Sequence, residues 1–151
     1  MRKYLLILLL SFWLVGCNLS YHVKNSEYNY IRTSRYHNDI SFDAKIVTSR
    51  EEMIDCIGTY TLVNFNNFET LNEYNDSFFE NKSLIIVPLI TPSGGDRYKI
   101  KSYKINGSEI ILNVKATSKG ITCDLGEWFM ILEINSNKVE NIDKVSFNVN
   151  K

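Results

Sequence analysis

The sequence is poor in the residue types on which most active-site assignments rest. Its 151 residues include only two histidines, three cysteines and two prolines, and its 17 Lys+Arg balance its 17 Asp+Glu. Nucleic acid attracts basic proteins through its phosphates, so a chain without net charge is not expected to bind it. With 44% hydrophobic and 23% charged residues, the composition is that of an ordinary globular protein, and the length favours one domain.

The chain also lacks an apolar run of the roughly 20 residues that a membrane-spanning helix needs. Residues 4–15 are uncharged and follow the basic pair Arg2 and Lys3, which is typical of a signal peptide. They lead into Leu-Val-Gly-Cys at residues 14–17, which resembles the bacterial lipobox. The resemblance implies that residues 1–16 are removed and that an acylated Cys17 anchors the chain on the extracytoplasmic side of the cell membrane. An ordinary secretory signal or an uncleaved anchor is the alternative.

The segment after the leader is polar and rich in tyrosine. Residues 17–41 show no periodic apolar pattern over a full window, which predicts a lipidated tether ahead of a single domain at residues 42–151. Both histidines, His22 and His37, fall in this segment. Neither has a second metal-binding residue at ligand spacing, so we expect solvated histidines, no metal and no cofactor.

Local patterns predict an α+β domain of one or two short helices and about six strands, mostly antiparallel. Residues 40–48 alternate in part as a first strand does, and Ser49 and Glu52 have the spacing of a capping box. The capping box predicts a short helix that ends at Gly58.

Two further segments have the pattern of central strands. Residues 83–90 and 127–134 are apolar on both faces, as strands covered on both sides are. Pro88 cannot donate to a ladder, so the first strand is expected to be bulged there or unpaired on one side.

The clearest local signal is a hairpin. Residues 97–105 and 109–117 are rich in β-formers and flank Asn106-Gly107, which favours a type I′ turn. Residues 142–149 then alternate apolar and polar side chains, which predicts an antiparallel strand with one solvated face.

The loop at residues 93–97 is a candidate binding site. It lacks both the Gly-Lys-Ser/Thr of a phosphate-binding loop and the glycine spacing of a nucleophile elbow. A turn between strands explains it best, although an exposed glycine-rich loop also suits binding. The candidate residues are Ser93, Gly94, Gly95, Asp96 and Arg97.

The cations of the predicted hairpin form a second candidate surface. Arg97, Lys99, Lys101 and Lys104 lie on one strand, and period two places Lys99 and Lys101 on one face. Such a face could contact an anionic wall polymer or lipid headgroups, but solvent-facing lysines also prevent association between strand edges.

Cys56 and Cys123 are the only cysteines left after lipidation of Cys17. Export permits a disulfide between them, whereas a lone helix cysteine is commonly a small core residue. The sequence leaves both possibilities open.

The order of elements resembles the C-terminal domain of the protease complex subunit PrcB. Residues 76–87 carry most of the likeness, and Ser93-Gly94-Gly95 stands where that family has Thr-Gly-Gly. The resemblance implies a non-catalytic accessory or protein-binding module and supplies no catalytic residues.

We therefore expect a non-enzymatic cell-surface lipoprotein that touches the membrane through its lipid and binds a protein or cell-wall partner. The alternative is a surface hydrolase that uses Ser93 or Cys123 with an unrecognised base. Both histidines lie in the predicted tether, which counts against it.

Overall fold

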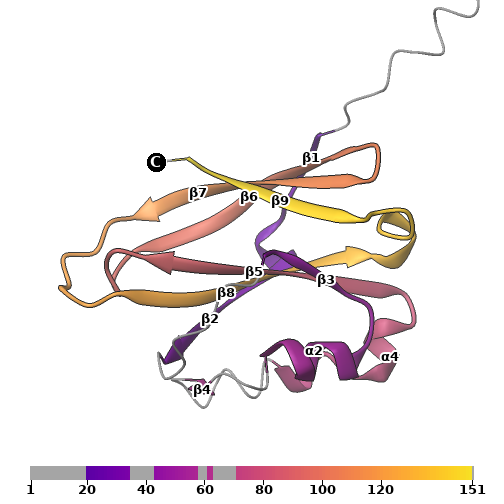
Figure 1. The fold of residues 1–151 in the computed structure, drawn as a ribbon, viewed down its shortest axis with the longest axis horizontal. Helices are drawn as coiled ribbons and strands as arrows, with labels where there is room; N and C mark the ends of the chain where they lie inside the picture. The colour runs from indigo at the N-terminus through magenta and orange to yellow at the C-terminus, as the bar shows by residue number, and fades with distance from the viewer. Residues whose placement is uncertain (1–19, 35–42, 58–60, 63–70, 151) are drawn as a thin grey trace, which may run out of the picture.

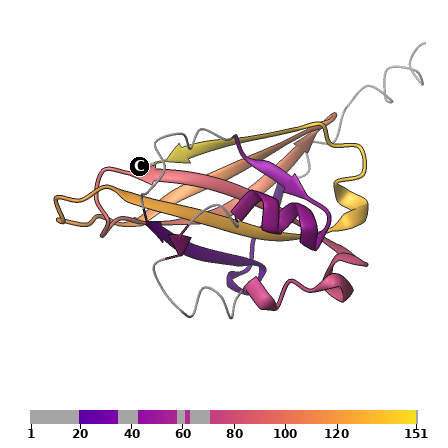
Figure 2. The same cartoon turned by 60° about the horizontal axis from the view of Figure 1, so that its bottom comes forward.

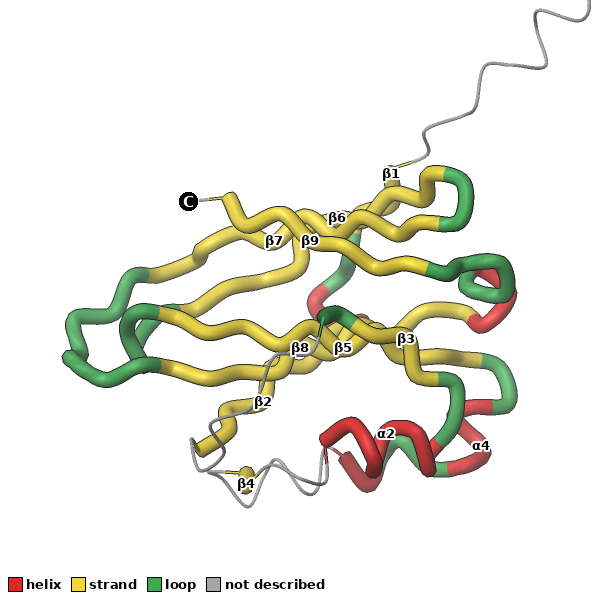
Figure 3. Tube along the Cα trace, viewed as in Figure 1, coloured by secondary structure: helices red, strands yellow, loops and turns green. Residues whose placement is uncertain are grey.

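The computed structural model describes residues 20–34, 43–57, 61–62 and 71–150. These residues form two stacked sheets, with the helices on the outer side of one of them (Figures 1 and 2). The hairpin sheet has the order β1-β6-β7-β9, and the helix-side sheet has the order β3-β5-β8-β2-β4. Strands dominate the structure (Figure 3). Most of their pairings are antiparallel, which confirms the predicted α+β class.

The elements of the hairpin sheet are β1 (Ser20–His22), β6 (Arg97–Asn106), β7 (Glu109–Ser118) and β9 (Lys144–Asn150). Those of the helix-side sheet are β2 (Tyr28–Ser34), β3 (Lys45–Val47), β4 (Thr61–Leu62), β5 (Lys82–Thr91) and β8 (Gly126–Asn135). The helices are η2 (Asn25–Glu27), α2 (Arg50–Ile57), α4 (Asp76–Phe79) and η3 (Ser136–Lys138).

The strands β5 and β8 are central, as predicted. Each has a partner on both sides in the helix-side sheet. Alternate residues, such as Val87 and Met130, face the core between the two sheets. Ile86 and Ile131 face the second core, which lies between the helix-side sheet and the helices α2 and α4. Burial on both faces explains why these strands are continuously apolar.

Pro88 lies where β5 has an open edge. The pairing of β3 with β5 covers only Leu84, Ile85 and Ile86, whereas the β5–β8 register continues through Pro88 and Phe129. The proline therefore removes no hydrogen bond to β3, and the alternative of a strand unpaired on one side is confirmed.

The predicted cap of α2 is present. The Glu52 N–H donates to Ser49 Oγ at 3.1 Å, and the Glu52 carboxylate accepts the Thr48 N–H at 2.7 Å. This hydrogen bond from the Thr48 backbone lowers the pKa of Glu52 below its ordinary value. Gly58, the predicted end of the helix, lies outside the described residues.

The hairpin is confirmed, but its predicted turn type was wrong. Asn106 pairs with Glu109 at the end of the ladder, so the two loop residues are Gly107 and Ser108. Gly107 has a φ of 60°, and in the described residues no other residue has a positive φ. A single positive φ at the first loop position is the type II′ arrangement, in which glycine is preferred there.

The last strand runs in the opposite direction to the one predicted. β9 has one solvated face, with Asn148 exposed and Val145 and Phe147 packed on the core. It pairs parallel to β7, however, along the edge of the hairpin sheet. Alternation defines the buried face of a strand, whereas its neighbour depends on the path of the chain, which crosses from β8 in the other sheet through η3.

The prediction of a tether was wrong for residues 20–34. β1 pairs with β6 in the hairpin sheet, and β2 pairs with β8 in the helix-side sheet. Tyr21 stacks on Tyr103, and Ile31 is buried beneath the helices. Two short strands that belong to different sheets give no long periodic pattern, so the sequence of this segment does not reveal them. Residues 17–19 and 35–41 lie outside the described residues.

Candidate functional site

Two loops meet at one end of the molecule, on the left in Figure 1. One is the β5–β6 loop, residues 92–96, and the other is the β7–β8 loop, residues 119–125. Each loop crosses between the sheets, and β5 pairs with β8 while β6 pairs with β7. The last pairs of those ladders, Thr91 with Gly126 and Arg97 with Ser118, bring the loops together. We call these two loops the loop pair.

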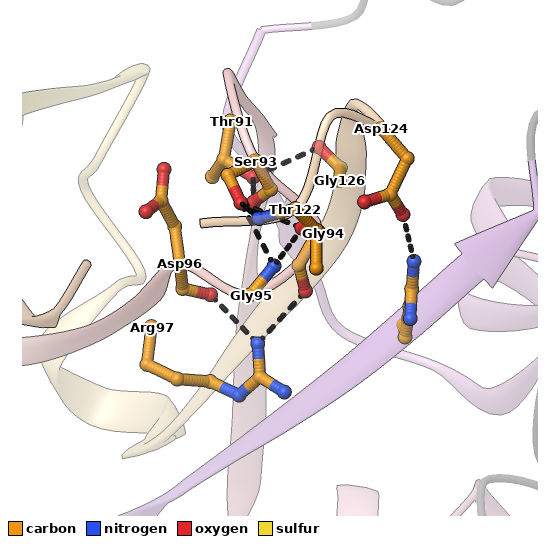
Figure 4. A network of polar contacts seen from close by, with 10 residues as sticks. Thr91, Ser93, Gly94, Gly95, Asp96, Arg97, Thr122, Asp124 and Gly126 are labelled. Carbon is orange, nitrogen blue, oxygen red and sulfur yellow. Dashed lines mark hydrogen bonds and ion pairs between the residues drawn. The ribbon is translucent and has the colours of Figure 1, made fainter. Parts of the chain in front are cut away.

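Ser93 lies inside the loop pair rather than on its surface. Its side chain is 6% exposed, and its Oγ lies 2.7 Å from Thr122 Oγ1. The same Oγ accepts the backbone N–H groups of Gly95 and Thr122, each at 3.2 Å (Figure 4). Three polar contacts therefore hold this hydroxyl between the two loops.

Asp96 makes a second connection between the loops. Its side chain is also 6% exposed, and Oδ1 accepts the Gly120 N–H at 2.8 Å. A backbone hydrogen bond from Gly94 to the Asp124 carbonyl, 2.7 Å long, adds a third connection. The two loops thus form one hydrogen-bonded body.

The glycines of the loop pair permit close approach. A Cβ on Gly120 would lie 2.4 Å from the Gly95 carbonyl carbon, and a Cβ on Gly95 would lie 2.8 Å from the Gly120 Cα. Neither distance can be tolerated between backbone atoms without a shift of one loop. Neither Gly94 nor Gly95 has a positive φ.

Arg97 connects the loop pair to Trp128 of the helix-side sheet. Its Nη1 donates to the carbonyls of Gly94 and Asp96 at 3.0 and 2.9 Å. Its Cζ stands 4.6 Å from the centre of the Trp128 ring, and Tyr30 from β2 stacks on the same ring at 4.3 Å. The guanidinium is therefore held by hydrogen bonds and a cation–π contact together.

A second arginine that the sequence did not predict joins the site from β2. Arg32 Nη2 lies 2.9 Å from Asp124 Oδ2, and the Arg32 Cζ stands 5.5 Å from the Trp128 ring centre. Arg32 lies in the segment that the sequence analysis interprets as a tether. For the β7–β8 loop, which contains its partner Asp124, the only sequence signal of a turn was the pair of glycines at positions 120 and 126.

The outer rim of the loop pair carries apolar side chains. Ile121 is fully exposed, and Leu125 is 48% exposed. Ile90, which is 55% exposed, lies on β5 next to Thr91, the last residue of that strand. The rigid, hydrogen-bonded interior therefore supports an apolar rim at this end.

The two domain cysteines are not bonded to each other. Cys56 is half-buried on α2, and Cys123 is exposed on the loop pair. Figure 1 places α2 beneath the helix-side sheet and the loop pair at the end of the strands. Burial raises the pKa of the Cys56 thiol above its ordinary value. Cys17 lies outside the described residues.

No family model, curated protein or solved structure matches this chain. The resemblance to the PrcB C-terminal domain therefore stays a prediction. No helix among the described residues is long and apolar enough to cross a membrane. In the same residues, no three His, Cys, Asp or Glu side chains gather as metal ligands would, and His22 lies on β1 with its side chain exposed.

Proposed function

We propose that this protein is a non-enzymatic, lipid-anchored binding module on the extracytoplasmic side of the cell membrane, and that its loop pair receives a protein partner. The lipobox-like sequence at residues 14–17 supports the anchor. The PrcB-like order of elements supports a binding role.

The observation that carries the proposal is an apolar rim on a rigid base. Exposed apolar side chains concentrated on one loop are a candidate contact site for other proteins. Ile121 and Leu125 project from a loop whose interior polar groups are bonded across to its neighbour. A loop that is ordered before binding loses less conformational entropy when a partner docks.

The environment of Ser93 supports a non-catalytic role. A serine nucleophile needs an adjacent base to take its proton. Ser93 Oγ contacts the Thr122 hydroxyl and two backbone N–H groups, and none of these is a base. Its 6% exposure also leaves little access for a substrate.

Capture of the protein with its partner from intact cells tests the rim. The double variant Ile121→Ser/Leu125→Ser is expected to weaken capture by about tenfold or more, since apolar anchors at an interface centre dominate affinity. The matched control is Ile54→Ser, which changes a side chain of 52% exposure on α2 and should leave capture unchanged. Equal recovery of one stoichiometric partner by both variants would contradict the proposal.

The intact mass of the membrane-extracted protein tests the anchor. The expected mass is that of residues 17–151 with acyl groups on Cys17. A mass that corresponds to the unprocessed chain, or to cleavage elsewhere without lipid, would show that the anchor is wrong.

A further inference from the structure

The outer face of the hairpin sheet is strongly cationic, although the whole chain has no net charge. Its four strands contain a single carboxylate, Glu109, which lies 3.1 Å from the Lys144 amine. In the described part of the chain, no ion pair holds the other lysines of this face. These are Lys99, Lys101, Lys104 and Lys115.

One arrangement on this face works against the stability of the sheet. Lys99 on β6 stands directly opposite Lys115 on β7. Like charges at directly opposed positions of an antiparallel pair are destabilising. An anionic ligand would relieve this repulsion, for which the described residues provide no ion pair.

Neutral hydrogen-bonding groups line a groove beside Lys104. A shallow groove of about 660 Å³ crosses the face next to Lys104. Hydroxyl and amide side chains can donate to phosphate oxygens, and lysine binds phosphate as a point charge. The polar residues that line the groove with Lys104 are Ser20, Ser102, Asn113, Asn148 and Asn150.

Acidic residues gather on the opposite side of the molecule. α2 carries Glu51, Glu52 and Asp55 against one arginine, and α4 begins with Asp76. Figure 1 shows these helices beneath the helix-side sheet, away from the hairpin sheet. The two layers therefore have opposite charge, which would orient the molecule at a charged surface.

The described residues begin at the edge of the cationic face. Ser20 on β1 pairs with Lys104, and it is only three residues after Cys17 in the sequence. Three extended residues reach about 10 Å, which is close to the Debye length of about 8–10 Å at physiological salt. A lipid on Cys17 would thus hold this face where headgroup charges still act on it.

We propose that the outer face of the hairpin sheet lies on anionic phospholipid headgroups of the membrane that anchors the chain. Lys99, Lys101, Lys104 and Lys115 face the phosphates, and the acidic helices point away. This orientation rests on the proposed anchor at Cys17. It leaves the loop pair at the side of the docked molecule, open to a partner.

Lysine labelling of the lipidated protein in vesicles tests the orientation. Vesicles of phosphatidylcholine with phosphatidylglycerol are compared with vesicles of phosphatidylcholine alone, and acetylation of each amine is followed by mass spectrometry. We expect the four lysines of the face to be labelled about fivefold more slowly on the anionic vesicles. In 1 M salt, where the Debye length is about 3 Å, the difference should vanish. Lys45, an exposed residue of β3, is the internal control and should be labelled equally on both.

Charge variants separate electrostatic docking from simple crowding at the membrane. Lys99→Gln/Lys115→Gln should abolish the protection of Lys101 and Lys104, whereas Lys99→Arg/Lys115→Arg should retain it. Equal labelling of the face on both kinds of vesicle would overturn the orientation alone. Protection by soluble poly(glycerol phosphate), without any effect of phosphatidylglycerol, would assign the face to a wall polymer and overturn it too. A chain that does not float with either vesicle would overturn the anchor, and the orientation with it.

Discussion

At Gly120, a single hydrogen in place of a methyl group decides whether the two loops can meet. Its N–H reaches the Asp96 carboxylate, and its Cα faces the Gly95 backbone. Ser93 and Asp96 reach their hydrogen-bond partners only because the two loops approach each other this closely. Ser93 and Asp96, which the sequence placed in a candidate binding loop, therefore hold the two loops of the loop pair together.

Gly120→Ala should destabilise the fold, although the substitution deletes no hydrogen-bonding group. The added Cβ would lie 2.4 Å from Gly95, and overpacking of this kind costs about 1–3 kcal/mol of unfolding free energy. Urea denaturation measures the change. Lys119→Ala, at the exposed neighbouring position, should stay within about 0.5 kcal/mol of the original chain. Equal stability of all three proteins would show that the loops are not packed as described.

At the scale of an element, α2 shows how little of a short helix has to be apolar. Met53 and Ile57 are 4% and 2% exposed against the helix-side sheet, whereas Ile54 between them is 52% exposed. The cap at Ser49 and Glu52 closes the first turn. The packing of Met53 and Ile57, together with the cap at Ser49, thus positions the helix.

Met53→Ala should cost about 2–3 kcal/mol of unfolding free energy, because it removes a buried side chain and leaves a cavity. Ile54→Ala on the adjacent residue is expected to cost less than about 0.5 kcal/mol, since its side chain is half-exposed. Chemical denaturation of the two variants provides the comparison. Similar losses would mean that α2 is rotated relative to the arrangement described.

At the scale of the whole molecule, the N-terminal segment joins the two sheets. β1 extends the hairpin sheet, and β2 continues the helix-side sheet beyond β8. Between them, η2 carries the chain from one layer to the other. The domain therefore includes residues 20–34, which precede the predicted boundary at residue 42.

A chain of residues 43–151 is expected not to fold, whereas a chain of residues 18–151 should unfold cooperatively in urea. The shorter chain lacks Ile31, which is 1% exposed, and uncovers the edge of β8. An uncovered central strand promotes aggregation. Fluorescence of Trp128, on which Tyr30 stacks, reports the transition in both chains. Cooperative unfolding of the shorter chain would restore the interpretation of residues 20–34 as a dispensable tether.

Prediction from the sequence worked where the signal was local. The faces of β5 and β8, the Ser49 cap and the position of the hairpin follow from neighbours a few residues apart. The same rules placed Ser93, Gly94, Gly95, Asp96 and Arg97 in a loop. They could not supply its partners, because Ser93 and Thr122 are 29 residues apart and Arg32 and Asp124 are 92 apart.

The sequence by itself determined that both faces of β5 and β8 are buried and where the hairpin turns, since periodicity and backbone preference are properties of short segments. The tertiary structure decided that β9 is parallel to β7, that β1 and β2 belong to the sheets, and that the two loops form one body. It also placed the lysines on one face and the carboxylates of α2 on the other. Each of these depends on which distant strands become neighbours, and that is set by burial of the whole core rather than by any one segment.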